Sequence, residues 1–568
     1  MSNKFIVLIL IITSTLLANP VGFDLKYSKL NNELDSLQSL KFEELKNIKR
    51  KLDRIIDRDF KLTDKRISPS KRNLLAKLIF RVASSFHDYE EYVELKQYNK
   101  IVGINEILAS SKELNGEDIE RLYNMLKSIA PNLTRRDLLN SERDLLDLYK
   151  PQYDNSLYYY NLLTNKFPES EYTDDALFNK AFINYEVLKK PNKAISILKN
   201  LLKKYPESNC SEASNFILGE YYFDPERNPT NDLVKDSMLV RKSISYYREV
   251  VNRHNTEKDY YYNSLFRLAF CYYRTYSFDL ATKYLTRTIE ELYERYGESV
   301  DADKENMLNL CIEYLAFSFR DRPWKDENMS ASSLKEHIAT RDDMGKKALS
   351  HYGSEIFKKL GYIYKDGGDY DLAIASFDSL LNLYPGYENA PLIQEEIIKS
   401  HEENITLEGE ERERKLYSER NRFFSKFKRG QYWDRNNRDK RKNLSVDSLI
   451  SKNMLLNINN LQVRAQKSNN KEMFAETVSL INGYINELPS DSNCYRLKWY
   501  KGSILGNNLN KPLESYEIFM DLSRDSLTTS FKDKDSGLNL SSKKAARNAI
   551  IMAGKIRKLE QSKTKENE

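Results

Sequence analysis

Glycine and proline are scarce in this sequence. The 568 residues include 18 glycines and 14 prolines, so that glycine makes up about 3% of the chain against roughly 7% in average proteins. A chain with so few turn-forming residues cannot make many tight turns. Its composition therefore favours long helices over a fold of many short strands.

Residues that usually support catalysis or metal binding are also few. The five histidines make no H-E-x-x-H or other metal spacing, and the cysteines form no C-x-x-C pair. The sequence lacks G-x-S-x-G, a P-loop and G-x-G-x-x-G. We therefore expect neither an enzyme nor a bound metal or cofactor. Cys271 and Cys311 are expected to be buried free thiols, but export would permit a disulfide, and the sequence selects no pair among Cys210, Cys271, Cys311 and Cys494.

The charges of the chain are nearly balanced, with 90 basic and 84 acidic residues and a net charge of +6. Such a balance gives no general reason to expect nucleic acid as a partner. Charged residues make up 31% and apolar residues 40% of the chain, which suits helices with one buried stripe and one charged face. The 39 tyrosines and 24 phenylalanines argue against disorder.

Residues 1–19 have the features of a secretory signal. Lys4 precedes the apolar run 5–18, and Ala18 offers a small residue for cleavage. The run ends at Asn19-Pro20, before the roughly 20 apolar residues that a membrane span requires. We therefore expect a cleaved signal and export, although an uncleaved anchor is the alternative.

Small residues recur at a fixed spacing, which predicts pairs of antiparallel helices that pack closely where small residues meet. The clearest repeat covers 357–385. Gly361 is the small residue of its first helix, and Ala373, twelve positions later, is that of its second. Phe377 is expected to fill the space between the two helices, and Pro385 ends the repeat.

Further repeats follow the same pattern with varying regularity. A half repeat lies at 158–170. Three further repeats are identified by pairs of small residues, Ala181 and Ala194, Ala269 and Ala281, and Gly502 and Ser515. A fourth begins around Gly219, and its second helix, around 243–251, follows an insertion. The pair Ala269 and Ala281 is again twelve apart, whereas Ala181 and Ala194 are thirteen apart.

This pattern resembles the tetratricopeptide repeat family over about residues 150–395, and the recurring Tyr/Phe-Pro is similar to its bacterial envelope branch. The resemblance implies an all-α fold, an α-solenoid of antiparallel helix pairs in a right-handed superhelix. It also implies a non-catalytic scaffold, periplasmic or associated with the outer membrane of a Gram-negative bacterium.

The expected organisation has six parts. They are a signal peptide at 1–19, an N-terminal helical region with divergent repeats at 20–150, the array at 151–400, a basic linker or helix at 401–450, divergent C-terminal helices at 451–556 and a disordered tail at 557–568. Two arrays are expected to meet near 404–450.

In the family that the sequence resembles, the first helix of each pair lines a concave groove. The corresponding positions here are rich in aromatic rings, which suit an extended peptide or an amphipathic helix. The alternative is that neighbouring helices or an N-terminal segment cover these rings. The expected groove residues are Phe178, Phe182, Tyr185, Phe216, Phe223, Phe266, Phe270, Tyr273 and Tyr362.

A basic, aromatic stretch runs from Arg412 to Lys442. In a cytosolic protein it would suggest RNA, but export makes nucleic acid an unexpected partner. If the stretch is functional, we expect it to bind anionic lipid head groups or an acidic partner. The alternative is a solvated helix and linker. The residues expected to form the patch are Arg420, Arg422, Lys426, Lys428 and Arg429.

These features favour a scaffold that binds other envelope proteins and supports assembly of an outer-membrane or periplasmic complex. A glycan-binding protein for nutrient uptake is the main alternative, although no cysteine for a lipid anchor follows the signal. An enzyme of cell-wall turnover is a third class, and the sequence has no segment that resembles the catalytic motifs of lytic transglycosylases.

Overall fold

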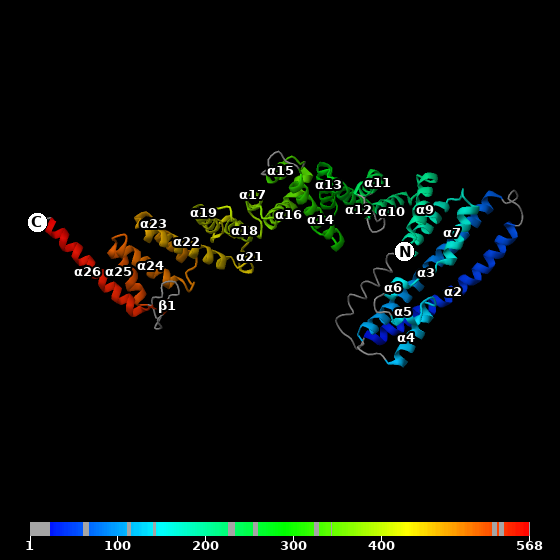
Figure 1. The fold of residues 1–568 in the computed structure, drawn as a ribbon, viewed down its shortest axis with the longest axis horizontal. Helices are drawn as coiled ribbons and strands as arrows, with labels where there is room; N and C mark the ends of the chain where they lie inside the picture. The colour runs from blue at the N-terminus through cyan, green and yellow to red at the C-terminus, as the bar shows by residue number, and fades with distance from the viewer. Residues whose placement is uncertain are drawn as a thin grey trace. The chain divides into compact units, whose positions relative to one another are not determined.

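The structure, a computed structural model, describes residues 23–60, 68–110, 115–139, 144–224, 233–253, 259–322, 329–341, 343–524, 531–532 and 539–566. The expected signal at 1–19 lies outside these residues. The fold is an all-α solenoid (Figure 1), as the sequence predicted. Its two described strands, β1 (Phe531–Lys532) and β2 (Asn539–Leu540), form a short antiparallel pair.

Two compact units make up the chain, Met1–Cys271 and Tyr272–Glu568, and their division falls within helix α12 (Asp259–Arg274). The first unit contains, before α12, α2 (Phe23–Phe60), α3 (Pro69–Ser110), α4 (Gly116–Ile129), α5 (Arg135–Leu139), α6 (Leu145–Leu148), α7 (Asp154–Lys166), α8 (Thr173–Phe182), η1 (Ile183–Val187), α9 (Pro191–Lys204), α10 (Ser211–Phe223) and α11 (Leu233–Arg253).

The second unit continues after α12 with a longer series of helices. They are α13 (Phe278–Tyr296), α14 (Ala302–Asp321), α15 (Met329–Ala339), α16 (Asp343–Asp366), α17 (Tyr370–Leu383), α18 (Ala390–Glu403), α19 (Gly409–Phe427), α20 (Tyr432–Asn436), α21 (Arg438–Asn443), α22 (Val446–Ser468), α23 (Lys471–Glu487), α24 (Cys494–Asn507), α25 (Pro512–Arg524) and α26 (Ser542–Glu566).

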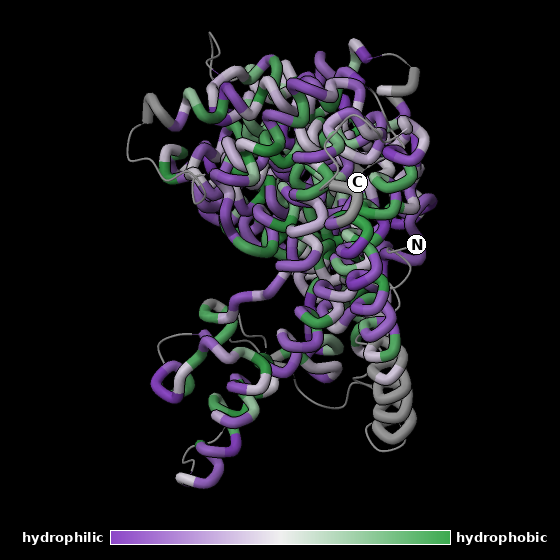
Figure 2. Tube along the Cα trace, turned by 90° about the vertical axis from the view of Figure 1, so that its right-hand side faces the viewer, coloured by the Kyte–Doolittle hydropathy of each residue, from purple (hydrophilic) through white to green (hydrophobic). Residues whose placement is uncertain are grey.

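Most of the packing within each unit joins helices that are neighbours in the chain, although α3 also packs against α7. In the first unit the contacts run α2–α3, α3–α7, α7–α8, α8–α9, α9–α10 and α10–α11, and in the second unit they include α16–α17, α17–α18, α18–α19, α22–α23, α23–α24, α24–α25 and α25–α26. Hydrophobic and hydrophilic residues are interspersed along the helices (Figure 2), as expected of helices that pack on one side and meet water on the other. Among the described helices, none has the apolar run that crossing a bilayer needs.

The two units divide at residue 271, and the expectation that two arrays meet near 404–450 stays a prediction. Residues in that region are part of the packed second unit, because α19 lies against both α18 and α22 and buries Leu416, Phe423 and Phe427. The run of charges predicted a linker or a helix, and α19 is a helix whose buried side consists of these three apolar residues and Arg420. The tail from Arg557, expected to be disordered, continues α26 as far as Glu566.

Glycines lie where the two helices of a repeat cross, as the spacing predicted. A Cβ placed on Gly219 would come within 2.5 Å of the ring of Tyr247, and one on Gly361 would overlap the ring of Phe377. In the C-terminal repeat the ring of Phe519 approaches Gly502 in the same way. A Cβ placed on Gly502 would lie 3.1 Å from that ring. In these repeats an aromatic residue of the second helix therefore fills the notch that the glycine leaves.

Replacement of the notch glycine is expected to destabilise the repeat. Gly361→Ala should lower the free energy of unfolding by about 1–3 kcal/mol, because the added methyl group forces Phe377 out of its rotamer or the helices apart. Urea denaturation followed by circular dichroism measures the change.

A matched control is Gly103→Ala in α3, where a Cβ meets no atom within 4 Å. This substitution should leave stability unchanged or raise it by up to about 1 kcal/mol, because alanine favours a helix more than glycine does. Equal behaviour of the two variants would show that Gly361 does not mark a close crossing.

The thirteen-residue spacing between Ala181 and Ala194 has a local structural cause. The first helix of that repeat ends in the π-helix η1, where the N–H of Leu188 donates to the carbonyl of Ile183 at 2.9 Å. A π turn holds one residue more than an α turn. The extra residue is thereby taken up before the second helix begins, and Ala181 and Ala194 both remain in one buried cluster.

In four repeats the turn between the helices contains one residue with positive φ. In each repeat this turn residue lies five positions before the small residue of the second helix. The four turn residues are Lys189, Tyr276, Gly368 and Asn510. The repeats spaced by twelve and by thirteen residues therefore share the same turn, and the extra residue lies on the first-helix side of it.

The N-terminal region is built differently from the repeats, around the long helices α2 and α3. Glu90 of α3 is buried, and its carboxylate accepts the backbone N–H groups of Asn155 (3.0 Å) and Ser156 (3.3 Å) at the start of α7. Burial raises the pKa of Glu90. This carboxylate satisfies free donors at the N-terminus of another helix, a contact that sequence spacing does not reveal.

Candidate partner-binding surfaces

The aromatic residues predicted for a groove divide between accessible and buried positions. Five of those in the first unit are partly accessible, and we call these five the aromatic face: Phe178, Phe182, Phe216, Phe223 and Phe270. Tyr185 and Phe266 belong instead to the core, with 5% and 8% of their surface exposed. Neither of these two rings can provide a contact surface for a partner while the helices stay packed.

The most exposed ring of the aromatic face is Phe182, which is 38% exposed. It stacks beside Phe178 with 6.4 Å between the ring centroids. Phe182 ends α8, and η1 begins at the next residue. Because a π turn rotates the residues that follow it relative to α-helical spacing, Tyr185 turns into the cluster around Ala194 instead of lying beside Phe182.

The rings of α10 and α12 contact one another across the two helices. Phe223 meets Phe270 edge to face at 5.6 Å between centroids, and Phe216 lies 5.4 Å from Tyr260. Each contact covers part of both rings. Tyr260 is itself 36% exposed and extends the face, although the repeat spacing did not identify it.

Charged groups accompany the rings on these helices. The guanidinium of Arg267 lies 5.1 Å over the ring of Phe223, and its Nε is 2.9 Å from the carboxylate of Glu220. The same carboxylate accepts the hydroxyl of buried Tyr247 at 2.6 Å. The aromatic face therefore has a fixed polar pair at one side, which could orient a bound polar group.

Tyr273 and Tyr362, also predicted for the groove, lie in the second unit. The hydroxyl of Tyr273 donates to Asp321 at 2.6 Å, and its ring packs edge to face on Tyr314. Tyr362 packs edge to face on Phe377 at 5.4 Å. Burial is the main cause of a raised pKa for both hydroxyls. Both side chains are half-buried, and their part in binding stays a prediction.

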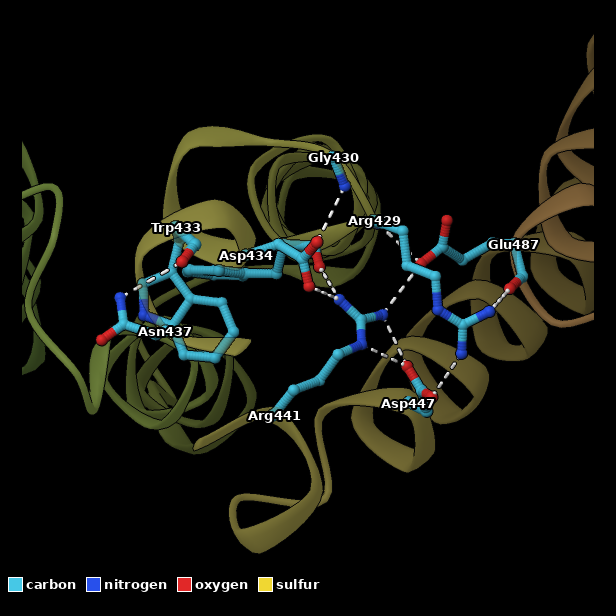
Figure 3. Close-up of polar contacts among 9 residues, drawn as sticks. Arg429, Gly430, Trp433, Asp434, Asn437, Arg441, Asp447 and Glu487 are labelled. Carbon is cyan, nitrogen blue, oxygen red and sulfur yellow. Dashed lines mark hydrogen bonds and ion pairs between the residues drawn. The ribbon is translucent and has the colours of Figure 1, made fainter. Parts of the chain in front are cut away.

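The C-terminal part of the basic stretch forms an ion-pair network rather than a row of solvated cations (Figure 3). The guanidinium of Arg441 lies among three carboxylates, at 2.9 Å from Asp434, 2.5 Å from Asp447 and 2.8 Å from Glu487. Arg429 joins the same network through Asp447 at 2.8 Å. Arg441, Asp434 and Glu487 expose only 8–11% of their side chains.

Other contacts tie this stretch to the turn between α17 and α18. The indole N–H of Trp433 donates to the carbonyl of Tyr387 at 2.9 Å. The side-chain amide N–H of Asn437 donates to the backbone carbonyl of Gly386 at 3.3 Å. The loop around α20 and α21 therefore connects the turn at 386–387 to the end of α23 within the second unit.

Three of the five residues predicted for a basic patch are used in internal contacts. Arg420 is buried and pairs with Glu402 at 2.8 Å, Arg422 pairs with Asp378 at 2.5 Å, and Arg429 belongs to the network. Lys426 is half-buried, and burial together with Arg422 lowers its pKa. Lys428 lies 5.5 Å over the ring of Phe424. Recognition of lipid or of an acidic partner by these five residues stays a prediction.

Reactive groups are either dispersed or buried. In the described part of the chain, no three His, Cys, Asp or Glu side chains come together as a possible metal site. All four cysteines are free thiols. Burial and the Asp175 carboxylate raise the pKa of Cys210 to about 12, and burial raises that of Cys494. These thiols are poor nucleophiles at neutral pH, because the thiolate is the reactive form.

Acid should destabilise the second unit through His337. Burial, assisted by Arg341, lowers the pKa of His337 to about 4, and its Nε2 lies 2.9 Å from the hydroxyl of Thr286. The unfolded chain, with a His pKa near 6.5, takes up the proton first. Neutral His337 therefore makes its full contribution to the free energy of unfolding above about pH 6.5, and this contribution is lost as the pH falls toward 4.

The expected loss is of the order of 2 kcal/mol after allowance for partial exposure of the ring. Melting temperatures from pH 7 to pH 4.5 measure it. His337→Gln keeps a hydrogen-bonding side chain and should show a smaller loss over this interval. Parallel pH profiles of the variant and the native chain would contradict the assignment to His337.

Comparison with known proteins supports the repeat assignment in two segments. The tetratricopeptide repeat family matches residues 175–208 and 359–387, which contain the repeats of Ala181 and Gly361. No curated protein matches the chain.

Three solved structures are similar in part. A structure of Naa15/Naa10 bound to HypK-THB is 12% identical, with 75% of this chain and 62% of that chain covered and a TM-score of 0.24. The TPR domain of P58(IPK) is 12% identical (71% and 94% covered, TM-score 0.17), and a human IFIT1 dimer with m7Gppp-AAAA is 13% identical (84% and 94% covered, TM-score 0.18). The chain thus spans less than two thirds of the Naa15-complex chain. TM-scores this low do not bear on function.

Folds of tetratricopeptide repeats are typically non-catalytic binding scaffolds. The sequence spacing, the crossings at glycine and the two matched segments agree with one another. The chain carries tetratricopeptide repeats within an all-α solenoid, and these repeats imply a role in protein interaction.

Proposed function

We propose that this chain is an exported scaffold that binds a partner protein on the aromatic face of its first unit. The partner would belong to the cell envelope, and binding would support assembly of an outer-membrane or periplasmic complex. The observation that carries the proposal is the exposure of Phe182, with Phe178 stacked beside it, on the first helix of a matched repeat.

The chemistry of the face suits an amphipathic helix or an extended peptide. Burial of apolar surface contributes about 25 cal/mol per Å² before the cost of ordering the partner is subtracted. Aromatic rings lose little entropy when a partner binds, because they have few rotatable bonds. The Glu220–Arg267 pair beside Phe223 adds a polar contact that could fix the orientation of the bound segment.

A double variant tests the face directly. Phe178→Ala with Phe182→Ala should weaken capture of a partner from envelope extracts at least tenfold, because each buried ring contributes on the order of 1 kcal/mol or more. Helicity should be kept, and the melting temperature should fall only modestly, because Phe182 is exposed although Phe178 also packs against the cluster around Ala194. Tyr98→Ala with Tyr158→Ala is the matched control, because it removes two exposed rings elsewhere in the same unit. Equal loss in both variants would contradict a specific face.

Glycan binding is the alternative, because exposed rings such as Phe182 can also stack on sugars. Retention of the chain on polysaccharide, lost in the Phe178/Phe182 variant, would support it over a protein partner. Capture of one protein in stoichiometric amount, with no polysaccharide retention, would support the scaffold.

Export is part of the proposal and rests on residues 1–19. Expression of the full chain in a Gram-negative host followed by fractionation tests it. We expect a periplasmic or outer-membrane-associated product whose N-terminus begins after residue 18 or 19. A full-length product in the cytosolic fraction would contradict export and, with it, an envelope partner.

A further inference from the structure

The last helix of the described chain presents a face that no other described element covers. We define the basic face of α26 as Lys543, Lys544, Arg547, Ile550, Ile551, Gly554, Arg557 and Lys558, all of which are exposed. These positions follow helical spacing, so they share one side of the helix. Ile550 is 73% and Ile551 49% exposed, an unusual exposure for two adjacent isoleucines.

The opposite side of α26 fixes the helix to the second unit. Ala545, Ala549 and Met552 are buried in a cluster with Phe519 of α25. The ammonium of Lys555 donates to the carbonyl of Gly506 at 3.0 Å at the end of α24. The helix is therefore docked, and its basic face points away from the side that packs.

Charge is concentrated on this helix. The span 542–566 contains eight basic and two acidic residues, and the remainder of the chain contains 82 of each. The whole net charge of +6 is thus that of α26. For the five cations of the basic face, the described residues provide no ion pair, whereas the cations at 420–429 mostly have internal partners.

We propose that the basic face of α26 binds an anionic lipid bilayer surface, with Ile550 and Ile551 entering the interface and the cations contacting head groups. Helices that lie on membranes combine apolar residues with many lysines and arginines. Each such cation strengthens binding to an anionic leaflet.

Two other kinds of partner fit the face less well. Protein interfaces are depleted in lysine, and this face has three lysines and no carboxylate. A nucleic acid would pair its phosphates with the cations but would give the isoleucines little to contact. A bilayer surface satisfies both groups at once. This inference does not depend on the aromatic face, because the two surfaces belong to different units.

Vesicle sedimentation with the full chain tests the proposal. We expect binding to vesicles of phosphatidylglycerol and phosphatidylcholine in equal parts, little binding to pure phosphatidylcholine, and weaker binding at high salt. Each cation should strengthen binding about fivefold. The triple variant Arg547→Glu, Arg557→Glu, Lys558→Glu should therefore weaken partitioning at least about 100-fold.

Two further variants identify the face and the apolar contribution. Arg464→Glu, Lys467→Glu, Lys471→Glu makes the same charge change at exposed cations of α22 and α23, and it should weaken partitioning far less. Ile550→Ser with Ile551→Ser keeps every charge and should weaken partitioning about tenfold. Unchanged melting temperatures verify that all three variants fold.

Several outcomes would overturn the proposal. They are equal binding to pure phosphatidylcholine, equal loss in the two charge-reversal variants, and no loss in the isoleucine variant. Binding to soluble heparin that competes with vesicles and is insensitive to the isoleucines would assign the face to a soluble polyanion instead. Partner capture through Phe178 and Phe182 should be unaffected by any change in α26, which separates this test from that of the scaffold.

Discussion

Arg441→Met should lower the free energy of unfolding of the second unit by about 3–5 kcal/mol, the usual cost of removing one partner from a buried ion pair. The guanidinium of Arg441 is the common partner of Asp434, Asp447 and Glu487. Without it, the nearly buried carboxylates of Asp434 and Glu487 would lose their nearest cation. Methionine keeps much of the volume of the aliphatic part of the arginine side chain. The change in the free energy of unfolding is therefore caused by the lost charge rather than by a cavity.

The free carboxylates would have two ways to recover, and both cost stability. They can take up a proton, which costs free energy at neutral pH because a carboxyl group ordinarily ionises far below pH 7 and the N–H of Gly430 still favours the ionised form of Asp434. Alternatively, the loop around α20 and α21 can open to water. Opening would expose Trp433, whose indole N–H donates to Tyr387.

Urea denaturation measures the global effect, and hydrogen exchange of peptides from 428–445 measures local opening. The control is Lys442→Met, which removes the same charge at the neighbouring, exposed position and should change stability by less than about 0.5 kcal/mol. If Arg441→Met and Lys442→Met behave alike, or if exchange in 428–445 stays slow, the network does not hold this loop in place.

The extent to which sequence predicts this fold depends on the range of the interactions. The notches at Gly361 and Gly219 were predictable, because the small residue and the ring that meets it belong to one helix pair. The π-helix at Ile183–Val187 was signalled only indirectly, by a spacing of thirteen instead of twelve. A one-residue insertion can be absorbed at several places, and only the structure shows which.

Contacts between distant segments could not be predicted in the same way. Glu487 lies 46 positions from Arg441, and no periodic pattern relates the two. The run of cations at 412–442 was therefore interpreted as a free surface, although several of its carboxylate partners come from other helices. By contrast, the basic face of α26 has the spacing of one helix, although its exposure depends on which side packs against α24 and α25.

The same limit applies to the aromatic residues, and a pair of substitutions separates those that bind from those that pack. Phe266→Ala should lower the free energy of unfolding by about 3–5 kcal/mol, because the Phe266 side chain is only 8% exposed and its removal leaves a cavity in the core. Phe182→Ala should cost less than about 1 kcal/mol, because water already reaches much of that ring.

Partner binding should show the opposite order. At a temperature where both variants remain folded, Phe182→Ala should weaken capture, whereas Phe266→Ala should retain it, apart from any loss through its contact with Phe270. Melting followed by circular dichroism and capture from envelope extracts provide the two measurements. A stable Phe266→Ala variant that fails to bind would show that Phe266 is accessible in solution, and that the helices around it open enough for a partner to reach the ring.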